Sequence, residues 1–398
     1  MKKNELIECL LTCLVLLIGL LSIKSLILIL PFPLYYLATT SKMPTLSPHS
    51  LVIIACTLLY VSVGLLTTTY IPNSFSISID YLILLVVFLM SSASICQAQN
   101  LRHVLCVLFC SIVSFVTIIT LLFYMMHQAD FVSLGFSDMT EFKHYYRPLF
   151  MLCNDNATLV LCLLPFTLLI TMQSDRSLRY WSLINMSLVN LCLMLSYSRG
   201  IYISTLVFYL VVFVMSVIYR KNRKGLVSIG VSFTSMVLAL SLSSVVRESV
   251  FTTVSFNKTE SQKRSLDSRI SKLETMVENN QNTFFGCGDG NYFISNLNNR
   301  TDFDSMVSAS SNNGIMQLYV ERGVLGIASL VALMMYIAII SIRRFVMGDF
   351  TTVVLACGVL VVAIRECTFA SFTRVNAVMF LCFIMVVLLI NKQCHEKQ

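Results

Sequence analysis

The chain has 398 residues, of which 57% are hydrophobic and only 12% are charged. Because charged residues make up roughly a quarter of an ordinary soluble domain, this composition excludes a soluble globular protein. The formal net charge of +8 does not indicate nucleic-acid binding, since the basic residues lie in short clusters between apolar runs instead of forming one patch.

Apolar runs recur from one end of the chain to the other, which predicts an all-α polytopic membrane protein with about 12 transmembrane helices. Residues 6–38 fit either one overlong helix or two short helices that are broken near Lys24. The N-terminal run has no small-residue cleavage site, so we interpret it as a retained first span and not as a signal peptide. The predicted runs are residues 6–22, 25–38, 50–69, 79–97, 103–125, 150–172, 178–196, 201–219, 226–245, 323–341, 351–367 and 376–391.

The positive-inside tendency favours two helices at the N-terminus. Both chain ends and the basic connections "QNLRH", "QSDRSLR", "RKNRKG" and "SIRRF" then lie in the cytoplasm. The predicted organisation is helices 1–9 in residues 1–245, a long, partly helical periplasmic loop in residues 246–313, and helices 10–12 with a short cytoplasmic tail in residues 314–398. The loop is expected to carry part of the active site.

The outer face of this topology presents two arginines outside the long loop. Arg147 ends a second polar segment that begins at His127, and it is a candidate for substrate binding. Arg199 lies in "LSYSRGIY", between two spans. Its guanidinium either snorkels to lipid headgroups or grips a phosphate of a membrane-bound substrate.

The long loop contains a pattern that is typical of an amphipathic helix, "QKRSLDSRISKLETMVENN" at residues 262–280. Arg269 and Lys272 lie three residues apart and therefore on one side of such a helix, and Arg264 precedes them. The basic residues are either a solvated face or a second phosphate clamp.

Further along the loop, "NTFFGCGDGNYF" has glycines at 286 and 288. They permit a tight turn, and the loop amides are candidates for binding an anion. The loop is followed by Asn312 and Asn313, either of which can cap the next helix, and by Glu321 near the membrane boundary. An ionisable residue there is a functional candidate, although a structural salt bridge to an outer-loop arginine is equally consistent with its position.

The sequence indicates neither a cofactor nor a metal site. Most of the 14 cysteines lie within apolar runs, and no CxxC pair occurs. A Gly-rich phosphate loop, an HExxH motif and a nucleotide fingerprint are also missing from the sequence.

Taken in chain order, these stretches resemble the O-antigen ligase and polymerase family of bacterial inner-membrane enzymes. The family's Ser-x-Ser-Arg-Gly-like motif matches Ser196–Gly200, and its arginine-containing loop helix matches "SLDSRISKL" at 265–273. Its Gly-x-Gly turn matches "FFGCG" at 284–288, and its His-Asn-x-x-Leu-Gln-Leu-x-x-Glu-x-Gly-x-x-Gly pattern matches residues 312–326. Upstream, Asn154–Phe166 is similar to the family's Asn-Ala span.

The resemblance implies a glycosyltransferase whose active site faces the periplasm and whose donor is an undecaprenyl-diphosphate-linked glycan. Because no Asp/Glu cluster suited to Mg²⁺ is expected on the outer face, we predict that the transferase is metal-independent. Arg199 and Arg269 are then the expected clamp on the diphosphate, with Arg264 as an auxiliary residue. Asn312 stands where the family has a histidine, and asparagine does not accept a proton at ordinary pH. Glu321, or a histidine of the other outer loop, is therefore the candidate base, and Asn312 and Asn313 are candidates for orienting the acceptor.

Three functions fit this reading. A polymerase adds the growing chain to another lipid-linked repeat unit, whereas a ligase moves the finished chain onto lipid A core. Asn312 in place of histidine favours the polymerase. A transporter or flippase of lipid-linked sugars is the third hypothesis. Membrane lipids, and a chain-length regulator or flippase, are the further partners that these functions suggest.

Overall fold

The structure is a computed structural model. It describes residues 13–28, 48–68, 70–94, 99–127, 148–172, 175–218, 223–254, 274, 282–292, 313–367, 377–382 and 384–386.

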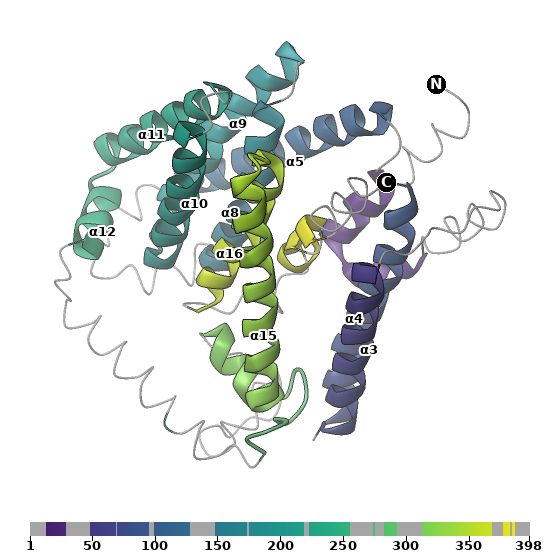
Figure 1. The fold of residues 1–398 in the computed structure, drawn as a ribbon. Helices are drawn as coiled ribbons and strands as arrows, with labels where there is room; N and C mark the ends of the chain where they lie inside the picture. Colours follow the sequence, from purple (N-terminus) through teal and green to yellow (C-terminus); the bar gives the residue numbers. More distant parts are fainter. Residues whose placement is uncertain are drawn as a thin grey trace. The chain divides into compact units, whose positions relative to one another are not determined.

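Every regular element in these residues is a helix, as Figure 1 shows. The 3-10 helices are η1 (Ile23–Leu28) and η2 (Pro148–Phe150). The α-helices are α3 (Pro48–Leu66), α4 (Ile71–Ser94), α5 (Gln99–Met126), α8 (Cys153–Thr171), α9 (Arg176–Met194), α10 (Arg199–Ile218), α11 (Arg223–Leu242), α12 (Ser244–Val254), α15 (Gly314–Val346) and α16 (Phe350–Glu366). The predicted all-α class is thus confirmed for the described part of the chain.

The chain divides into two compact units, which are described separately here. Unit 1 comprises Met1–Val104, Ser268–Ile337 and Glu366–Gln398, and unit 2 comprises Leu105–Asp267 and Ala338–Arg365. In unit 1, α3 packs against α4 and η1 packs against α4. In unit 2, α9 packs against both α8 and α11, and α10 packs against α11.

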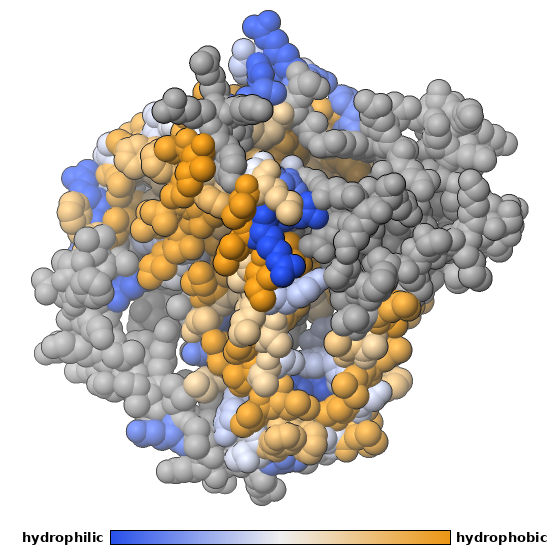
Figure 2. Space-filling view, in the orientation of Figure 1, coloured by the Kyte–Doolittle hydropathy of each residue, from blue (hydrophilic) through white to orange (hydrophobic). Residues whose placement is uncertain are grey.

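Five described helices are long and apolar enough to cross a membrane, which supports a multi-pass membrane protein. Figure 2 shows the same property on the surface, where apolar residues cover large parts of the described chain. On α10, for example, Leu206, Leu210 and Phe213 are exposed apolar side chains on one helix. The total of about 12 spans and the periplasmic side of the long loop remain predictions. The five helices are His103–Met126, Cys153–Thr171, Arg199–Ile218, Lys224–Leu242 and Gly314–Val346.

Helix α8 is the buried centre of unit 2. It is apolar on all sides, and a helix with that pattern is stable only where other helices surround it. The Thr167 hydroxyl donates to the Leu163 carbonyl, and the Thr167 carbonyl accepts from the Ser182 hydroxyl of α9 at 2.6 Å.

Helix α4 begins at Ile71, whereas the sequence predicted a span from residue 79. Polar residues in its first turns lowered the mean hydropathy of the segment, so the predicted start of the helix came too late in the sequence. They are accommodated because Asn73 and Ser74 hydrogen-bond to a loop of the same unit. The first turns of α4 thus contribute polar side chains to this loop contact, although Ile71–Val87 is apolar overall.

Candidate functional site

The site in unit 1 is built around a break in helix α15. The side-chain oxygen of Asn313 caps the helix by accepting from the amides of Ile315 at 3.0 Å and Met316 at 3.3 Å, which confirms the predicted cap. Gly323 then interrupts the helix with φ 61° and ψ −157°, a conformation that glycine adopts without strain. Glu321 and Arg322 are the last two residues before this break.

Residues 282–292, the glycine loop, fill the break. The amides of Cys287 and Gly288 donate to the carbonyls of Val320 at 3.0 Å and Glu321 at 2.9 Å. In return, the Thr283 carbonyl accepts from the amide of Val324 at 2.9 Å. A helix end leaves backbone groups unsatisfied, and this exchange satisfies several of them.

Gly286 and Gly288 form the predicted turn, with φ 75° and 90°. A Cβ on Gly286 would collide with the backbone of Glu321, so the close approach of loop and helix requires glycine there. The amides of residues 286, 287 and 288 all donate to protein carbonyls. In this structure they are therefore not the anion-binding donors that the sequence suggested.

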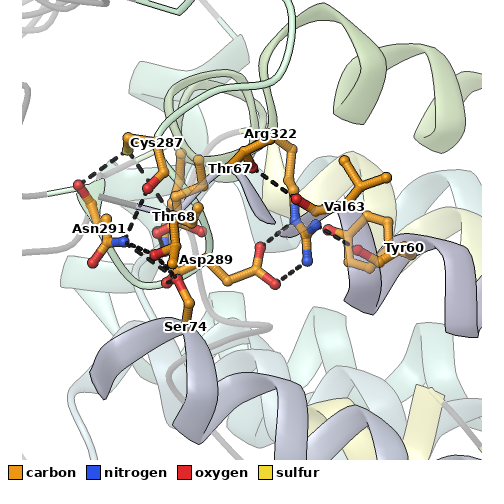
Figure 3. A network of polar contacts seen from close by, with 12 residues as sticks. Tyr60, Val63, Thr67, Thr68, Ser74, Cys287, Asp289, Asn291 and Arg322 are labelled. Carbon is orange, nitrogen blue, oxygen red and sulfur yellow. Dashed lines mark hydrogen bonds and ion pairs between the residues drawn. The ribbon is translucent and has the colours of Figure 1, made fainter. Parts of the chain in front are cut away.

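Arg322 is held by a buried ion pair with Asp289, drawn in Figure 3. The Nε atom donates to one carboxylate oxygen at 2.6 Å, and Nη2 pairs with the other oxygen. The remaining Nη1 donates to the Tyr60 carbonyl at 2.6 Å, and the guanidinium lies 3.7 Å from the centre of the Tyr60 ring. Burial raises the pKa of the Asp289 carboxyl, and the hydrogen bond and charge of Arg322 oppose that rise.

Asn291 joins the glycine loop to the turn between α3 and α4, as Figure 3 also shows. Its amide nitrogen lies 2.8 Å from the Thr68 hydroxyl, 3.2 Å from the Ser74 hydroxyl and 2.9 Å from the Cys287 carbonyl. The Cys287 thiol donates to the Asn291 carbonyl at 3.3 Å, and burial raises its pKa to about 12. A neutral thiol is a poor nucleophile, so Cys287 is structural.

Glu321 is buried, with 4% of its surface exposed. Its carboxylate accepts from the Gln317 amide at 3.0 Å and from the backbone N–H of Gly290. The neighbouring Arg322 forms an ion pair with Asp289. The salt bridge that the sequence allowed for Glu321 is thus made by its neighbour, Arg322, to an acidic loop residue. Glu321 is held by neutral donors.

The site in unit 2 surrounds the turn between α9 and α10, where Arg199 begins α10. Tyr197 adopts a left-handed conformation with φ 50°, and its hydroxyl donates to the Tyr124 hydroxyl at 2.7 Å. The Cys153 thiol at the start of α8 donates to the Ser196 carbonyl at 3.4 Å. The turn is thereby fixed to α5 and α8, while Arg199 is only partly buried.

Asn156 lies one turn into α8, in the stretch that resembles the family's Asn-Ala span. Its side-chain amide donates to the Thr120 hydroxyl of α5 at 3.1 Å, and the side chain is buried. This bond fastens the start of α8 to α5. Asn156 therefore contributes to the rigid frame behind the Arg199 turn.

The structure does not test all of the predicted site residues. Glu321, Asn313, Gly286 and Gly288 gather in unit 1, whereas Arg199 belongs to unit 2. Four of the predicted residues, together with most of the predicted amphipathic helix at 262–280, lie outside the described residues. The four are Arg147, Arg264, Arg269 and Asn312.

Sequence reasoning missed several residues that the structure brings to the glycine loop. Asp289 was visible as the one acidic residue of "GCGDG", and Arg322 as the basic neighbour of Glu321. Their pairing was not visible, because they lie 33 positions apart in different kinds of structure. Tyr60 contributes only a backbone carbonyl and a ring face, and neither leaves a sequence signal.

Comparison with known proteins agrees with the motifs. Residues 184–331 match the family model described as O-Antigen ligase, which supports membership of that family. The matched region includes the Arg199 turn, the glycine loop and the break in α15. No curated protein matches the chain.

Proposed function

We propose that this chain, which matches the O-antigen ligase family model over residues 184–331, is a glycosyltransferase of the bacterial inner membrane. It joins an undecaprenyl-diphosphate-linked oligosaccharide or polysaccharide to a glycan acceptor at the periplasmic face. The observation that carries the proposal is the buried Glu321 carboxylate, which neutral donors hold beside a break in a membrane helix. An ionisable residue is costly at such a boundary, and a catalytic role accounts for it.

In this proposal Glu321 is the general base. Its carboxylate takes the proton from an acceptor hydroxyl, the hydroxyl oxygen forms a bond to the anomeric carbon, and the bond from that carbon to the diphosphate oxygen breaks. Because Asn312 replaces the family's histidine, Glu321 supplies the proton acceptor that asparagine lacks. Asn313, whose side-chain oxygen caps α15, is proposed to help orient the acceptor together with Asn312.

Arg199 is the first member of the proposed diphosphate clamp. Negative charge grows on the departing diphosphate, so guanidinium groups that contact it stabilise the transition state more than the ground state. Arg199 suits this role because no described residue makes an ion pair or hydrogen bond with its guanidinium, and it is only partly buried. Arg269 is proposed as the second member, with Arg264 and Arg147 as auxiliary substrate contacts.

The proposed chemistry is independent of metal. The described residues contain no group of three His, Cys, Asp or Glu side chains placed to hold an ion. Arginines are the proposed source of the positive charge instead. Transfer that continues unchanged in excess chelator is the expected result.

The proposed function leans toward a polymerase because of Asn312, with a ligase as the alternative. Purified protein should elongate lipid-linked repeat units in the absence of lipid A core. If products form only when lipid A core is added, the protein is a ligase. If intact lipid-linked glycan crosses a vesicle membrane and no glycosidic bond forms, the third hypothesis, a flippase, replaces the transferase.

A further inference from the structure

We propose that Asp289 and Arg322 are positioning residues for Glu321. Their ion pair fixes the glycine loop so that the N–H of Gly290 meets the Glu321 carboxylate. The inference rests on the proposed function, in which Glu321 is the base. Asp289 and Arg322 are the two charged residues of the site that take no part in the proposed reaction itself.

The dipeptide Asp289–Gly290 of the glycine loop contacts the dipeptide Glu321–Arg322 of α15. Asp289 binds Arg322, and the next loop residue, Gly290, binds Glu321. The two contacts share one stretch of backbone, so a shift of residue 289 also moves the amide of residue 290. The ion pair therefore controls the position of a donor to the proposed base.

The guanidinium of Arg322 contacts the Asp289 carboxylate in a bidentate geometry. Two nitrogens of Arg322 contact the two oxygens of one carboxylate, and bidentate contact fixes orientation as well as distance. The third nitrogen binds the Tyr60 carbonyl of α3. Lysine carries the same charge but lacks the planar fork, so it does not reproduce this constraint.

Helix α4 also contacts Asp289 and Gly290, through their backbone carbonyls. The Ser74 hydroxyl donates to the Asp289 carbonyl at 2.7 Å, and the Asn73 amide donates to the Gly290 carbonyl at 2.9 Å. The carbonyls of the dipeptide are thus bound by α4 and its carboxylate by Arg322. The remaining amide of Gly290 points to Glu321.

Arg322 is not placed to bind substrate directly. Its side chain is 3% exposed, its nitrogens are taken by Asp289 and Tyr60, and a face of its guanidinium lies over the Tyr60 ring. A diphosphate would have to displace a buried carboxylate to reach it. Arg322 therefore acts through Glu321.

The test compares purified Arg322→Lys with wild type in the glycan-transfer assay, with KM measured for the lipid-linked donor. We expect kcat to fall by roughly 10- to 100-fold, because a displacement of about 1 Å costs that much at a catalytic group, while KM stays within about twofold. Hydrogen exchange should rise at the amides of residues 282–292. The matched control is Ser182→Ala, which removes a buried hydrogen bond to Thr167 in unit 2. It should lower stability without changing kcat per folded protein.

A second variant covers the case in which Arg322→Lys does not fold. The double variant Asp289→Asn with Arg322→Gln removes both charges of the ion pair together, so neither is left buried without its partner, and the protein should fold and show the same loss of kcat. A kcat per folded protein equal to wild type, in whichever variant folds, overturns the inference. Failure of the proposed function looks different, because wild type then forms no glycosidic bond or Glu321→Gln transfers at the wild-type rate.

Discussion

Arg322 in unit 1 and Arg199 in unit 2 both lie at the end of a helix, but their surroundings are opposite. The guanidinium of Arg322 is buried, paired with a carboxylate and stacked on an aromatic ring. That of Arg199 is partly exposed and has no ion-pair or hydrogen-bond partner among the described residues. An arginine is therefore a candidate phosphate contact when its N–H donors are not already engaged by the protein. The presence of an arginine alone is not enough.

The carboxylates of unit 1 show the same contrast. Asp289 is neutralised by Arg322, whereas Glu321 is held by the amides of Gln317 and Gly290. A paired carboxylate must lose its partner before it accepts a proton, but one that is held by neutral donors does not. The contrast is the reason for assigning Glu321 to chemistry and Asp289 to positioning.

Removing Arg322, whose donors are engaged by Asp289 and Tyr60, should have the largest effect on folding. Arg322→Ala leaves Asp289 as a buried, unpaired charge, which costs roughly 3–5 kcal/mol of stability. We expect much less folded protein in the membrane and a strongly lowered melting temperature in detergent. The combined Asp289→Ala and Arg322→Ala variant should be less destabilised than the sum of the single changes. Simple additivity would show that the two side chains are not coupled.

Removing Arg199 should lower the rate of catalysis and leave folding almost unchanged. Arg199→Ala should lower kcat by roughly 100- to 1,000-fold, the range found when one transition-state donor is lost. Its melting temperature should stay near that of wild type, because no described side chain loses a partner. Normal transfer by Arg199→Ala would remove Arg199 from the proposed clamp.

A methyl group at the glycine loop tests how closely the loop must approach the helix break. Gly286→Ala places a Cβ against the backbone of Glu321 and forces alanine to adopt φ 75°. We expect a loss of about 1–3 kcal/mol, measured by chemical or thermal unfolding. Gly230→Ala in α11 is the matched control, because a Cβ there meets no atom within 4 Å. Equal stability of the two variants would contradict the described packing.

The smallest effect is expected at the cap of α15. Asn313→Ala removes the acceptor for the amides of Ile315 and Met316, at a cost of about 1 kcal/mol. Asn313→Asp should retain most of the stability, since aspartate caps equally well. A loss of transfer in Asn313→Asp without a loss of stability would reveal a separate contact with the acceptor.

The helices were the most predictable part of the molecule. Helix α8 was predicted at residues 150–172 and runs from Cys153 to Thr171, because the largely apolar stretch that follows Asn156 favours a helix inside a membrane protein. The start of α4 was missed because Asn73 and Ser74 are polar. Their suitability depends on a loop more than 200 positions away. Hydropathy describes a segment and its solvent, but it does not register a distant partner.

The candidate site was predicted in its local features only. The glycine turn and the Asn313 cap depend on neighbouring residues and could be predicted from sequence. The opposite roles of Glu321 and Arg322 depend on which of them meets Asp289, and no spacing rule connects these residues. Tertiary contact therefore decided between the structural and the functional interpretation of Glu321.

The most direct test of the central claim is the rate of glycan transfer by Glu321→Gln. Glutamine keeps the size of the side chain and its contact with the Gln317 amide, but it cannot take a proton from the acceptor. The account predicts that kcat falls by roughly 100-fold or more while lipid-linked donor still binds. A wild-type rate in Glu321→Gln protein that is correctly folded would contradict it.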